Sequence, residues 1–515
     1  MKMLGMTASV LMAALPLVGA SYDVRSFGAK GDGLTKDTAA IQKALDAAGQ
    51  AGGGTVVVGA GQYLSGTIHL RSNVTLHLEN GAVILGSPDE GDYDPYETLP
   101  FQSVSDKETT YFHYALVAAE NVHHVAIVGE GAIDGNRTKR GGPKTVAMKL
   151  CQYVAIRGIT VQNSPNYSIS LWGVDYADID GVTVLNSYAD GIDPDASSHV
   201  RIANCYVDAH DDAICPKASP SMGMERRRPV EHLVVTNCVL RTDASCFKFG
   251  TESSGDFRHV AVSNVTMGPR VNGRRPNSGI SLESVDGSNI DGVVISNIEM
   301  HGVEAPIFVR LGNRGRGLEP AAPGSIENVS IENVVARDCS MTSSVTGLPG
   351  YAVKRVTLSN VRLGMSGGNR EPRGLDVPEF PQKYPEGRMF GQLPAYGLYG
   401  RHVEGLTLSN VRTHWEREDL RPAMVLDDVR DLTVDGFGME RAAGEEPAMW
   451  LNDVGEALLR GLRAVEGKSF LRVSGGKSKG IAVVGSDLRK AERAFDVREE
   501  AKGAVAEAGN VLRRE

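Results

Sequence analysis

The chain has 515 residues, with 54 basic and 63 acidic side chains and a net charge of −9. An excess of negative charge opposes binding to a polyanion, so we expect no nucleic-acid partner, and local basic groups must meet any acidic substrate. The 60 glycines and the 6% of aromatic residues suit a fold with many tight bends and thin, aliphatic layers.

The first twenty residues have the pattern of a secretory signal peptide. Lys2 precedes an apolar run from Val10 to Leu17, and small residues lead up to Ala20. The apolar run is too short to span a bilayer, and no later segment is apolar enough. We therefore expect a secreted or periplasmic protein without a membrane span.

Residues 37–49 predict a helix that closes the N-terminal end of the fold. Ile41, Ala44, Leu45 and Ala48 fall on one stripe at helical spacing, and glycine follows them. A repetitive fold leaves apolar surface open at its ends, so an amphipathic helix is a typical cap. Residues 21–120 are expected to hold this cap and the first coils.

Residues 121–490 are dominated by one short pattern of six positions. The first, third and usually the sixth positions are apolar, the second and fourth vary, and the fifth is Asn or Gly. The pattern begins at Val154, Ala177, Val200, Leu233, Val260, Val293, Val329, Val356, Leu406, Leu432, Ala457 and Ile481. The shortest interval is 23 residues, which is typical of a solenoid, and longer intervals carry loops. The alternation predicts a strand, and the fifth position tolerates the left-handed backbone of a bend.

These features predict an all-β, single-domain parallel β-helix with an N-terminal capping helix and two short strands in each coil. The repeat is lost after about residue 490. Residues 491–515 are expected to form a C-terminal cap or a tail.

Two acidic patches stand at similar places in consecutive repeats. Asp190 lies 13 residues after the start of its repeat, and Asp211 and Asp212 lie 11 and 12 residues after the start of the next. Stacked coils would therefore bring these carboxylates together on one lateral face. Asp is also a common bend residue, so either patch alone would carry little weight.

Clustered carboxylates suit the hydrolysis of a glycosidic bond. One protonated acid can give its proton to the leaving oxygen while a carboxylate activates water. Crowding like charges raises the pKa of one of them, which keeps that acid protonated. The same oxygens could instead hold calcium. For a hydrolase we expect neither a cofactor nor a metal.

At these positions the chain resembles glycoside hydrolase family 28, the polygalacturonase family of inverting, metal-independent pectin hydrolases on right-handed parallel β-helices. The resemblance covers roughly residues 22–365. It rests on the acids of the segment 188–193, on Asp211 and Asp212 at intervals of 21 and 22 residues from Asp190, and on the flanking segments 24–33, 131–136 and 163–165. It implies that Asp211 is the general acid and that Asp190 and Asp212 hold and activate the water.

Two motifs with which this family meets the substrate's carboxylate are missing. Ser245 stands where a Gly-His-Gly histidine is expected, and Glu283 ends the segment that replaces Arg-Ile-Lys. A bidentate arginine is hard to replace, so we do not expect the usual contacts with a uronic acid. Lys217, Lys248 and the basic loop that begins at Arg310 are candidate replacements, whereas a neutral sugar such as rhamnose would need none.

Other residues are candidates for contact with a sugar. Tyr188 and Asp193 flank Asp190 in the first patch. The longest insertion lies between two repeats and contains Tyr396 and Tyr399. Long insertions on a solenoid tend to build the wall of a cleft, and a walled cleft favours attack at chain ends.

The leading hypothesis is an exo-acting, inverting, polygalacturonase-like hydrolase of a polysaccharide or oligosaccharide. Three alternatives stay open: an α-rhamnosidase-like hydrolase of a neutral sugar, a calcium-dependent pectate-lyase-like enzyme with Lys217 or Lys248 as base, and a glycan-binding β-helix without catalysis. We expect a monomer, because a capped β-helix needs no partner. Cys205 and Cys238 occupy the same position in consecutive coils and either form a disulfide or stay unpaired.

Overall fold

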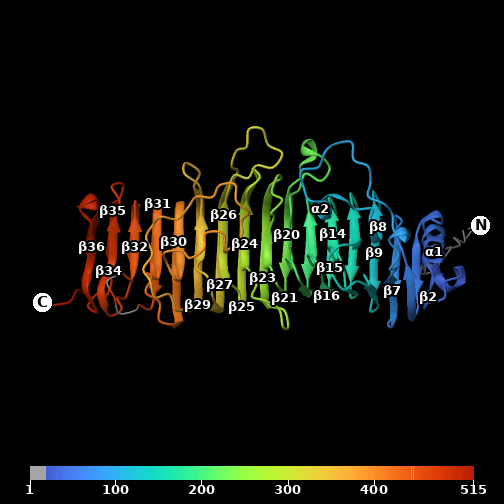
Figure 1. Cartoon of the computed structure of the whole chain (residues 1–515), viewed down its shortest axis with the longest axis horizontal. Coiled ribbons are helices and arrows are strands. Elements are labelled where there is room, and N and C mark those ends of the chain that lie inside the picture. The colour runs from blue at the N-terminus through green and yellow to red at the C-terminus, as the bar shows by residue number, and fades with distance from the viewer. Residues whose placement is uncertain (1–18, 442–443, 445, 515) are drawn as a thin grey trace, which may run out of the picture.

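The computed structural model describes residues 19–441, 444 and 446–514. Their strands stand side by side along one long axis, with the helix α1 at the N-terminal end (Figure 1). The strands pair in parallel, and the chain is a right-handed parallel β-helix, as predicted. The predicted signal peptide, except for its last two residues, lies outside the described residues. Within the described ranges, no helix combines the length and the apolar character needed to cross a membrane.

Each coil has three faces, A, B and C, and the prediction of two strands per coil is wrong. In one coil, β12 (Gln152–Arg157) lies on face A, β13 (Thr160–Gln162) on face B and β14 (Ile169–Trp172) on face C. Strands on face C lie outside the repeated pattern because their sequences vary. Thus β14 reads Ile-Ser-Leu-Trp, whereas the next strand on this face, β17 (Ile192–Asp195), reads Ile-Asp-Pro-Asp.

The remaining strands are grouped here by face. Face A also holds β1 (Ser21–Asp23), β3 (Gly54–Val58), β6 (Val74–Leu78), β9 (His123–Gly129), β15 (Asp175–Asp180), β18 (Ser198–Ala203), β20 (Val230–Thr236), β33 (Gly455–Arg460), β35 (Lys479–Val484) and β37 (Val505–Ala508). Face B also holds β2 (Asp32–Lys36), β4 (Gly61–Ser65), β7 (Ala82–Gly86), β10 (Ala132–Asp134), β16 (Thr183–Ser187), β19 (Tyr206–Ala209) and β21 (Val239–Thr242). Face C also holds β5 (Ile68–His69), β8 (Ala115–Glu120), β11 (Lys144–Lys149), β22 (Ser245–Phe249), β24 (Ser278–Ser284), β26 (Ala305–Leu311), β28 (Ser343–Thr346), β32 (Met449–Asn452), β34 (Gly467–Ser474) and β36 (Ala491–Val497).

In the C-terminal half, long strands turn the corners between faces and join them into one sheet. Those that run from face A to face B are β23 (Phe257–Pro269), β25 (Asn289–His301), β27 (Ser325–Cys339) and β29 (Val353–Gly367), and those that start on face C are β30 (Leu398–Arg417) and β31 (Met424–Gly438). The helices are α1 (Thr38–Gln50) and α2 (Lys107–Thr110), with short 3₁₀ turns η1 (Val24–Phe27), η2 (Glu90–Asp92), η3 (Met224–Arg226) and η4 (Glu499–Ala501).

Aliphatic side chains fill the interior and stack in register from coil to coil. Ile156, Ile179 and Ile202 are successive partners on face A, and all three are fully buried. Burying one such side chain contributes roughly 1.5–3 kcal/mol, so the column repeated along the helix supplies much of the stability.

The bend after each repeat has the predicted left-handed backbone. All twelve Asn or Gly residues at the fifth position have φ between 50° and 74°. From Asn204 to Asn410 the seven asparagines also form a ladder, in which each side-chain amide donates to the preceding one at 2.8–3.3 Å. The pattern therefore specified both the backbone and a line of hydrogen bonds.

The two ends of the helix are built from different elements. In α1, the predicted stripe of Ile41, Ala44, Leu45 and Ala48 is fully buried, which confirms the cap. Residues 491–508 continue the coil, because β36 and β37 pair with β34 and β35. All six cysteines are buried and free, so Cys205 and Cys238 stay unpaired.

Candidate active site

Three carboxylates from two consecutive coils meet on face C. The bridge between Ile192 and Ile214 sets the coils in register, so that Asp190 and Asp212, each two residues earlier, lie side by side. The backbone N–H of Asp212 donates to Asp190 Oδ1 at 3.2 Å. One oxygen each of Asp190, Asp211 and Asp212 lies within 4.8 Å of the other two. The clustering expected from the matching offsets is confirmed.

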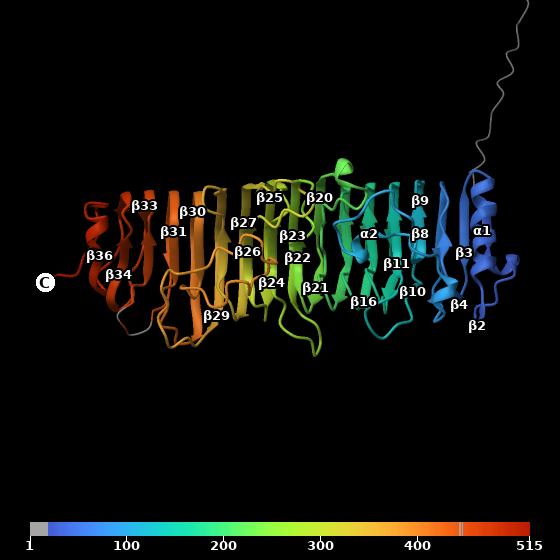
Figure 2. The same ribbon diagram turned by 45° about the horizontal axis from the view of Figure 1, so that its top comes forward.

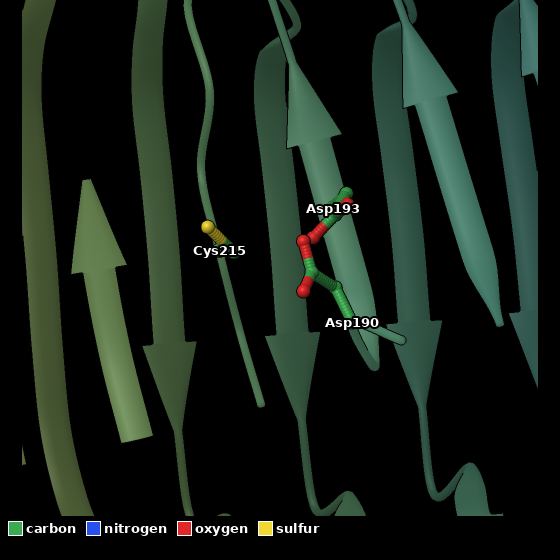
Figure 3. Close-up of side chains that lie close together, drawn as sticks. All are labelled: Asp190, Asp193 and Cys215. Carbon is green, nitrogen blue, oxygen red and sulfur yellow. The ribbon is translucent and has the colours of Figure 1, made fainter. Parts of the chain in front are cut away.

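Lys217 neutralises the most buried part of this cluster. Its Nζ lies 2.6 Å from Asp190 Oδ2 and 2.9 Å from Asp193 Oδ2. Figure 3 shows these two carboxylates turned toward each other, with Cys215 on the next coil. The ligating atoms of the three residues lie within 4.8 Å of one another, close enough for a metal ion. The ammonium group of Lys217 already supplies the positive charge that an ion would bring.

The pKa values of the two acids beside Lys217 are both raised. Burial and the neighbouring Asp193 raise the pKa of Asp190 well above its usual range, although Lys217 opposes the shift. Burial also raises the pKa of Asp193, to about 6, against the attraction of the same ammonium group. Taking a carboxylate out of water disfavours its charged form, so these acids accept protons more readily than exposed ones.

The pKa of Asp211 is shifted in the opposite direction. Arg140 Nη1 lies 2.5 Å from Asp211 Oδ2, and the rest of the guanidinium group pairs with Glu108 of α2. Burial raises the pKa of Asp211, but the charges of Arg140 and Lys248 outweigh burial and hold that pKa below its usual value. Neighbouring acids of the site therefore have pKa values that are shifted in opposite directions, and acid–base catalysis uses carboxyl groups with separated pKa values.

Lys248 and Ser245 complete the surroundings of Asp212. Lys248 Nζ lies 3.1 Å from Asp212 Oδ2 and donates to Tyr384 Oη at 3.2 Å. The backbone N–H of Ser245 donates to Asp212 Oδ1 at 2.8 Å. The residue at the expected histidine position thus orients a carboxylate of the cluster through its backbone, and its hydroxyl accepts from Ser278 at 3.0 Å.

Glu283 and Arg310 are paired neighbours on face C but have different surroundings. Glu283 is fully buried, accepts from the Ser281 hydroxyl at 2.5 Å and has a pKa raised to about 7 by burial, although Lys248 opposes the shift. Arg310 donates to backbone carbonyls of Gly347 and of residues 379–380. Burial lowers the pKa of Arg310 to about 10. These described contacts place Glu283 near Lys248 and tie Arg310 to the insertion between β29 and β30.

Tyr188 lies at the edge of the cluster. Its ring stacks on that of His210 at 4.9 Å, and its hydroxyl accepts from Asn186 at 2.9 Å. Arg270 donates to His210 and pairs with Asp208 at 2.7 Å. This network fixes the rings of Tyr188 and His210, which lie two residues before Asp190 and one residue before Asp211 in the chain.

Two segments from opposite directions along the helix contribute residues that the sequence analysis missed. Arg140 lies in the loop between β10 and β11, and Glu108 lies in α2, which rests beside β8 and β11 of face C (Figure 2). Tyr384 comes from the long insertion before β30, whereas Tyr396, at the end of that insertion, and Tyr399, in β30 itself, are fully buried. The insertion was expected to form a cleft wall, but nothing in its sequence distinguished Tyr384 from the other two tyrosines.

Comparisons with known proteins show the family of the chain. The model of the family "Glycosyl hydrolases family 28" matches residues 54–373, and a rhamnogalacturonase A/epimerase, pectate lyase-like model matches residues 21–83. A probable polygalacturonase of Vitis vinifera is 26% identical over 371 residues, covering 67% of this chain and 74% of the relative. An exo-poly-α-D-galacturonosidase of Dickeya chrysanthemi is 25% identical over 431 residues, covering 69% of each chain.

A solved structure shows the same fold along most of the chain. The exopolygalacturonase of Thermotoga maritima superposes with a TM-score of 0.59 at 20% identity, covering 77% of this chain and 92% of its own. The family model spans more than half of the chain and includes all three clustered acids. The chain therefore belongs to glycosyl hydrolases family 28 and is a glycosidase.

Proposed function

We propose that this glycosidase is secreted, acts on the ends of pectin-type polysaccharide chains, and hydrolyses the bond with inversion by means of Asp190, Asp211 and Asp212. The observation that carries the proposal is the meeting of these three carboxylates from consecutive coils, with one oxygen of each within 4.8 Å of the others. The relatives named polygalacturonase and exo-poly-α-D-galacturonosidase support the substrate class.

Exposure supports a division of roles among the acids. The side chain of Asp211 is 32% exposed, whereas those of Asp190 and Asp212 are 5% and 7% exposed. We therefore assign the exposed acid to the glycosidic oxygen of an entering sugar. We assign the two buried acids to a water molecule behind it.

The reaction is then a single displacement. Asp211, once protonated, gives its proton to the leaving glycosidic oxygen as the bond to the anomeric carbon breaks. Asp190 or Asp212, in its ionised form, takes a proton from water, whose oxygen attacks the same carbon from the opposite side. One displacement reverses the configuration of that carbon.

The walls around the cluster support action at chain ends. Glu108 and Arg140 approach from the N-terminal side of the helix, and Tyr384 approaches from the C-terminal insertion. Side chains on both sides limit how far a long polymer can pass through the site. This arrangement favours binding of a terminal sugar.

The lyase alternative lacks a suitable base among its candidates. Burial opposes the charge of Lys217, but Asp190 and Asp193 hold its pKa well above the usual value. Asp212 does the same for Lys248, again against burial. A lysine held protonated cannot abstract the proton that a lyase must remove.

Product analysis tests the proposal. The protein would be incubated with oligomers of homogalacturonan, rhamnogalacturonan and neutral glycans, and the released sugar and its first-formed anomer would be followed by proton NMR. We expect galacturonic acid from chain ends as the inverted anomer, unchanged by a chelator. Unsaturated products that a chelator abolishes would show a lyase, release of rhamnose would show a neutral-sugar hydrolase, and binding without release would show a glycan-binding protein. Secretion is tested separately by N-terminal sequencing of protein recovered outside the cytoplasm.

A further inference from the structure

The acid assigned as proton donor carries an ion pair that opposes this task. A general acid must hold a proton when the substrate arrives, yet Arg140 contacts Asp211 at 2.5 Å and favours its ionised form. Either the ion pair is permanent and Asp211 is a poor donor, or binding of the substrate breaks it.

Arg140 differs from the other cations of the cluster in its exposure. The side chains of Lys217 and Lys248 are 4% and 6% exposed, whereas that of Arg140 is 45% exposed. Breaking a buried pair leaves a charge without compensation away from water, whereas a solvent-exposed pair contributes little. Of these three cations, Arg140 is the one that can exchange its partner at low cost.

The second partner of Arg140 would keep the guanidinium group in place during such an exchange. Arg140 Nε donates to Glu108 Oε1 at 2.9 Å, and Nη2 contacts Glu108 Oε2. Only Nη1 is bound to Asp211. A carboxylate that competes for Nη1 can therefore displace Asp211 while Glu108 still anchors the arginine, and guanidinium groups bind carboxylates more strongly than neutral oxygens.

We propose that Arg140 is a specificity-determining residue, and that a substrate carboxylate takes Arg140 Nη1 from Asp211, so that the charge of the correct substrate converts Asp211 into the proton donor. This inference rests on the proposed function, because it requires a uronic acid as substrate. It also explains how a site without the family's Arg-Ile-Lys motif can distinguish a uronic acid from a neutral sugar.

The remaining charges around Asp211 determine the direction of the change. Lys248 and Lys217 still favour its ionised form, whereas burial and the neighbouring Asp190 and Asp212 favour protonation. Removing Arg140 therefore raises the pKa of Asp211. Asp211 takes up one proton from solvent, gives it to the glycosidic oxygen, and regains its pair with Arg140 when the product leaves.

Binding calorimetry tests this exchange independently of turnover. Galacturonate, its uncharged methyl ester and galactose would be titrated into the protein near pH 5. Two buffers with different ionisation enthalpies would be used, because the difference in measured heat reveals proton uptake. We expect galacturonate to bind with uptake of up to one proton and at least 10-fold more tightly than the two neutral sugars. Arg140→Gln should abolish the preference and the uptake. Arg137→Gln is the matched control, because Arg137 lies in the same loop and pairs with Glu90 at 3.0 Å.

Kinetics on galacturonide oligomers add a second test. The basic limb of the pH profile of kcat/KM reports the pKa of the acid in the free enzyme, and in Arg140→Gln this limb should move to higher pH. The preference for free over methyl-esterified substrate should fall at least 10-fold in the same variant. Galacturonate that binds without proton uptake, or an Arg140→Gln variant with an unchanged pH limb, would refute the exchange even if the enzyme cleaves galacturonides. Binding with proton uptake but without cleavage would refute the proposed function and leave the exchange standing. Failure to bind galacturonate would refute both.

Discussion

The ladder of asparagines and the acid cluster use the same stacking of coils for different purposes. At the bend between faces A and B, identical neutral side chains lie above one another from Asn204 to Asn410, and each amide satisfies the next. On face C, Asp190, Lys217 and Asp212 occur once each: Lys217 pairs with Asp190 and Asp193, and Asp212 pairs with Lys248. Repetition builds a scaffold, whereas departure from repetition builds a site.

The two regions also differ in what they contribute to stability. A neutral hydrogen bond contributes about 0.5–1.5 kcal/mol and can be lost from one coil with little effect on others. A buried charge without its partner costs several kcal/mol. Variants in the two regions should therefore differ in both activity and stability.

The largest effect is expected from Asp211→Asn, which removes the proposed proton donor. General acid catalysis contributes roughly 10²- to 10⁴-fold, so kcat on galacturonide oligomers should fall by this factor while the free energy of unfolding changes little. Steady-state kinetics and urea denaturation measure the two quantities.

Asp178→Asn is the control for this variant. Asp178 lies on face A and pairs with Arg157 and Arg201, away from the cluster. Its removal should change kcat less than twofold. A fully active Asp211→Asn variant would exclude Asp211 as the acid.

The next largest effect is expected from Lys217→Met. This change leaves Asp190 and Asp193 buried beside each other without a cation, and removal of one partner from a buried ion pair costs about 3–5 kcal/mol. Urea denaturation at pH 7 would measure the loss. Since protonation relieves the repulsion, the deficit should shrink at pH 5.

Lys36→Met provides a matched comparison at an exposed pair. Lys36 contacts Asp92 at 2.7 Å, and its side chain is 54% exposed. Its loss should cost about 0–1 kcal/mol. Equal losses in the two lysine variants would mean that the cluster on face C is no more sensitive than the surface.

The comparison also explains how much could be predicted from the sequence. The fold and the left-handed bends could be predicted because the Asn and Gly positions recur. The cap could be predicted because Ile41 and Leu45 fall on one stripe at helical spacing. The acids were found because their offsets match in two consecutive repeats. Arg140 and Tyr384 could not be found this way, because they lie in loops that occur once and reach the site through tertiary packing.

A smaller, pH-dependent effect is expected from Asp195→Asn. Burial raises the pKa of Asp195 to about 7, while its carboxylate accepts from Ser219. The folded state therefore keeps a proton that the unfolded chain loses above about pH 4. This contribution to stability is complete below about pH 4 and is lost as pH rises to about 7, by up to about 1.4 kcal/mol per pH unit. Asparagine can keep the contacts with Ser219, so the variant should show a flatter dependence of the free energy of unfolding on pH.

Asp178→Asn should change the same dependence in the opposite direction. Burial raises the pKa of Asp178, but the hydrogen bonds and charges of Arg157 and Arg201 together outweigh it and hold the pKa below the usual value. Its contribution is therefore present above the ordinary carboxyl range and lost as pH falls. If both variants changed the slope in the same direction, the assignment of a proton to buried Asp195 would be wrong.

A modest effect on stability, with none on activity, is expected in the asparagine ladder, at Asn297. This exposed residue has φ of 56°, donates to Asn264 at 3.0 Å and accepts from Asn333 at 3.1 Å. Asn297→Ala removes both hydrogen bonds and places a Cβ residue in the left-handed region, which together should cost about 2 kcal/mol. Asn297→Gly removes the same hydrogen bonds but tolerates the backbone, so it should cost about 1 kcal/mol. The difference between the two variants in urea denaturation isolates the backbone contribution, and kcat should be unchanged in both because the bend lies away from face C. Equal losses would show that the amide ladder, rather than the left-handed backbone, selects asparagine at this position.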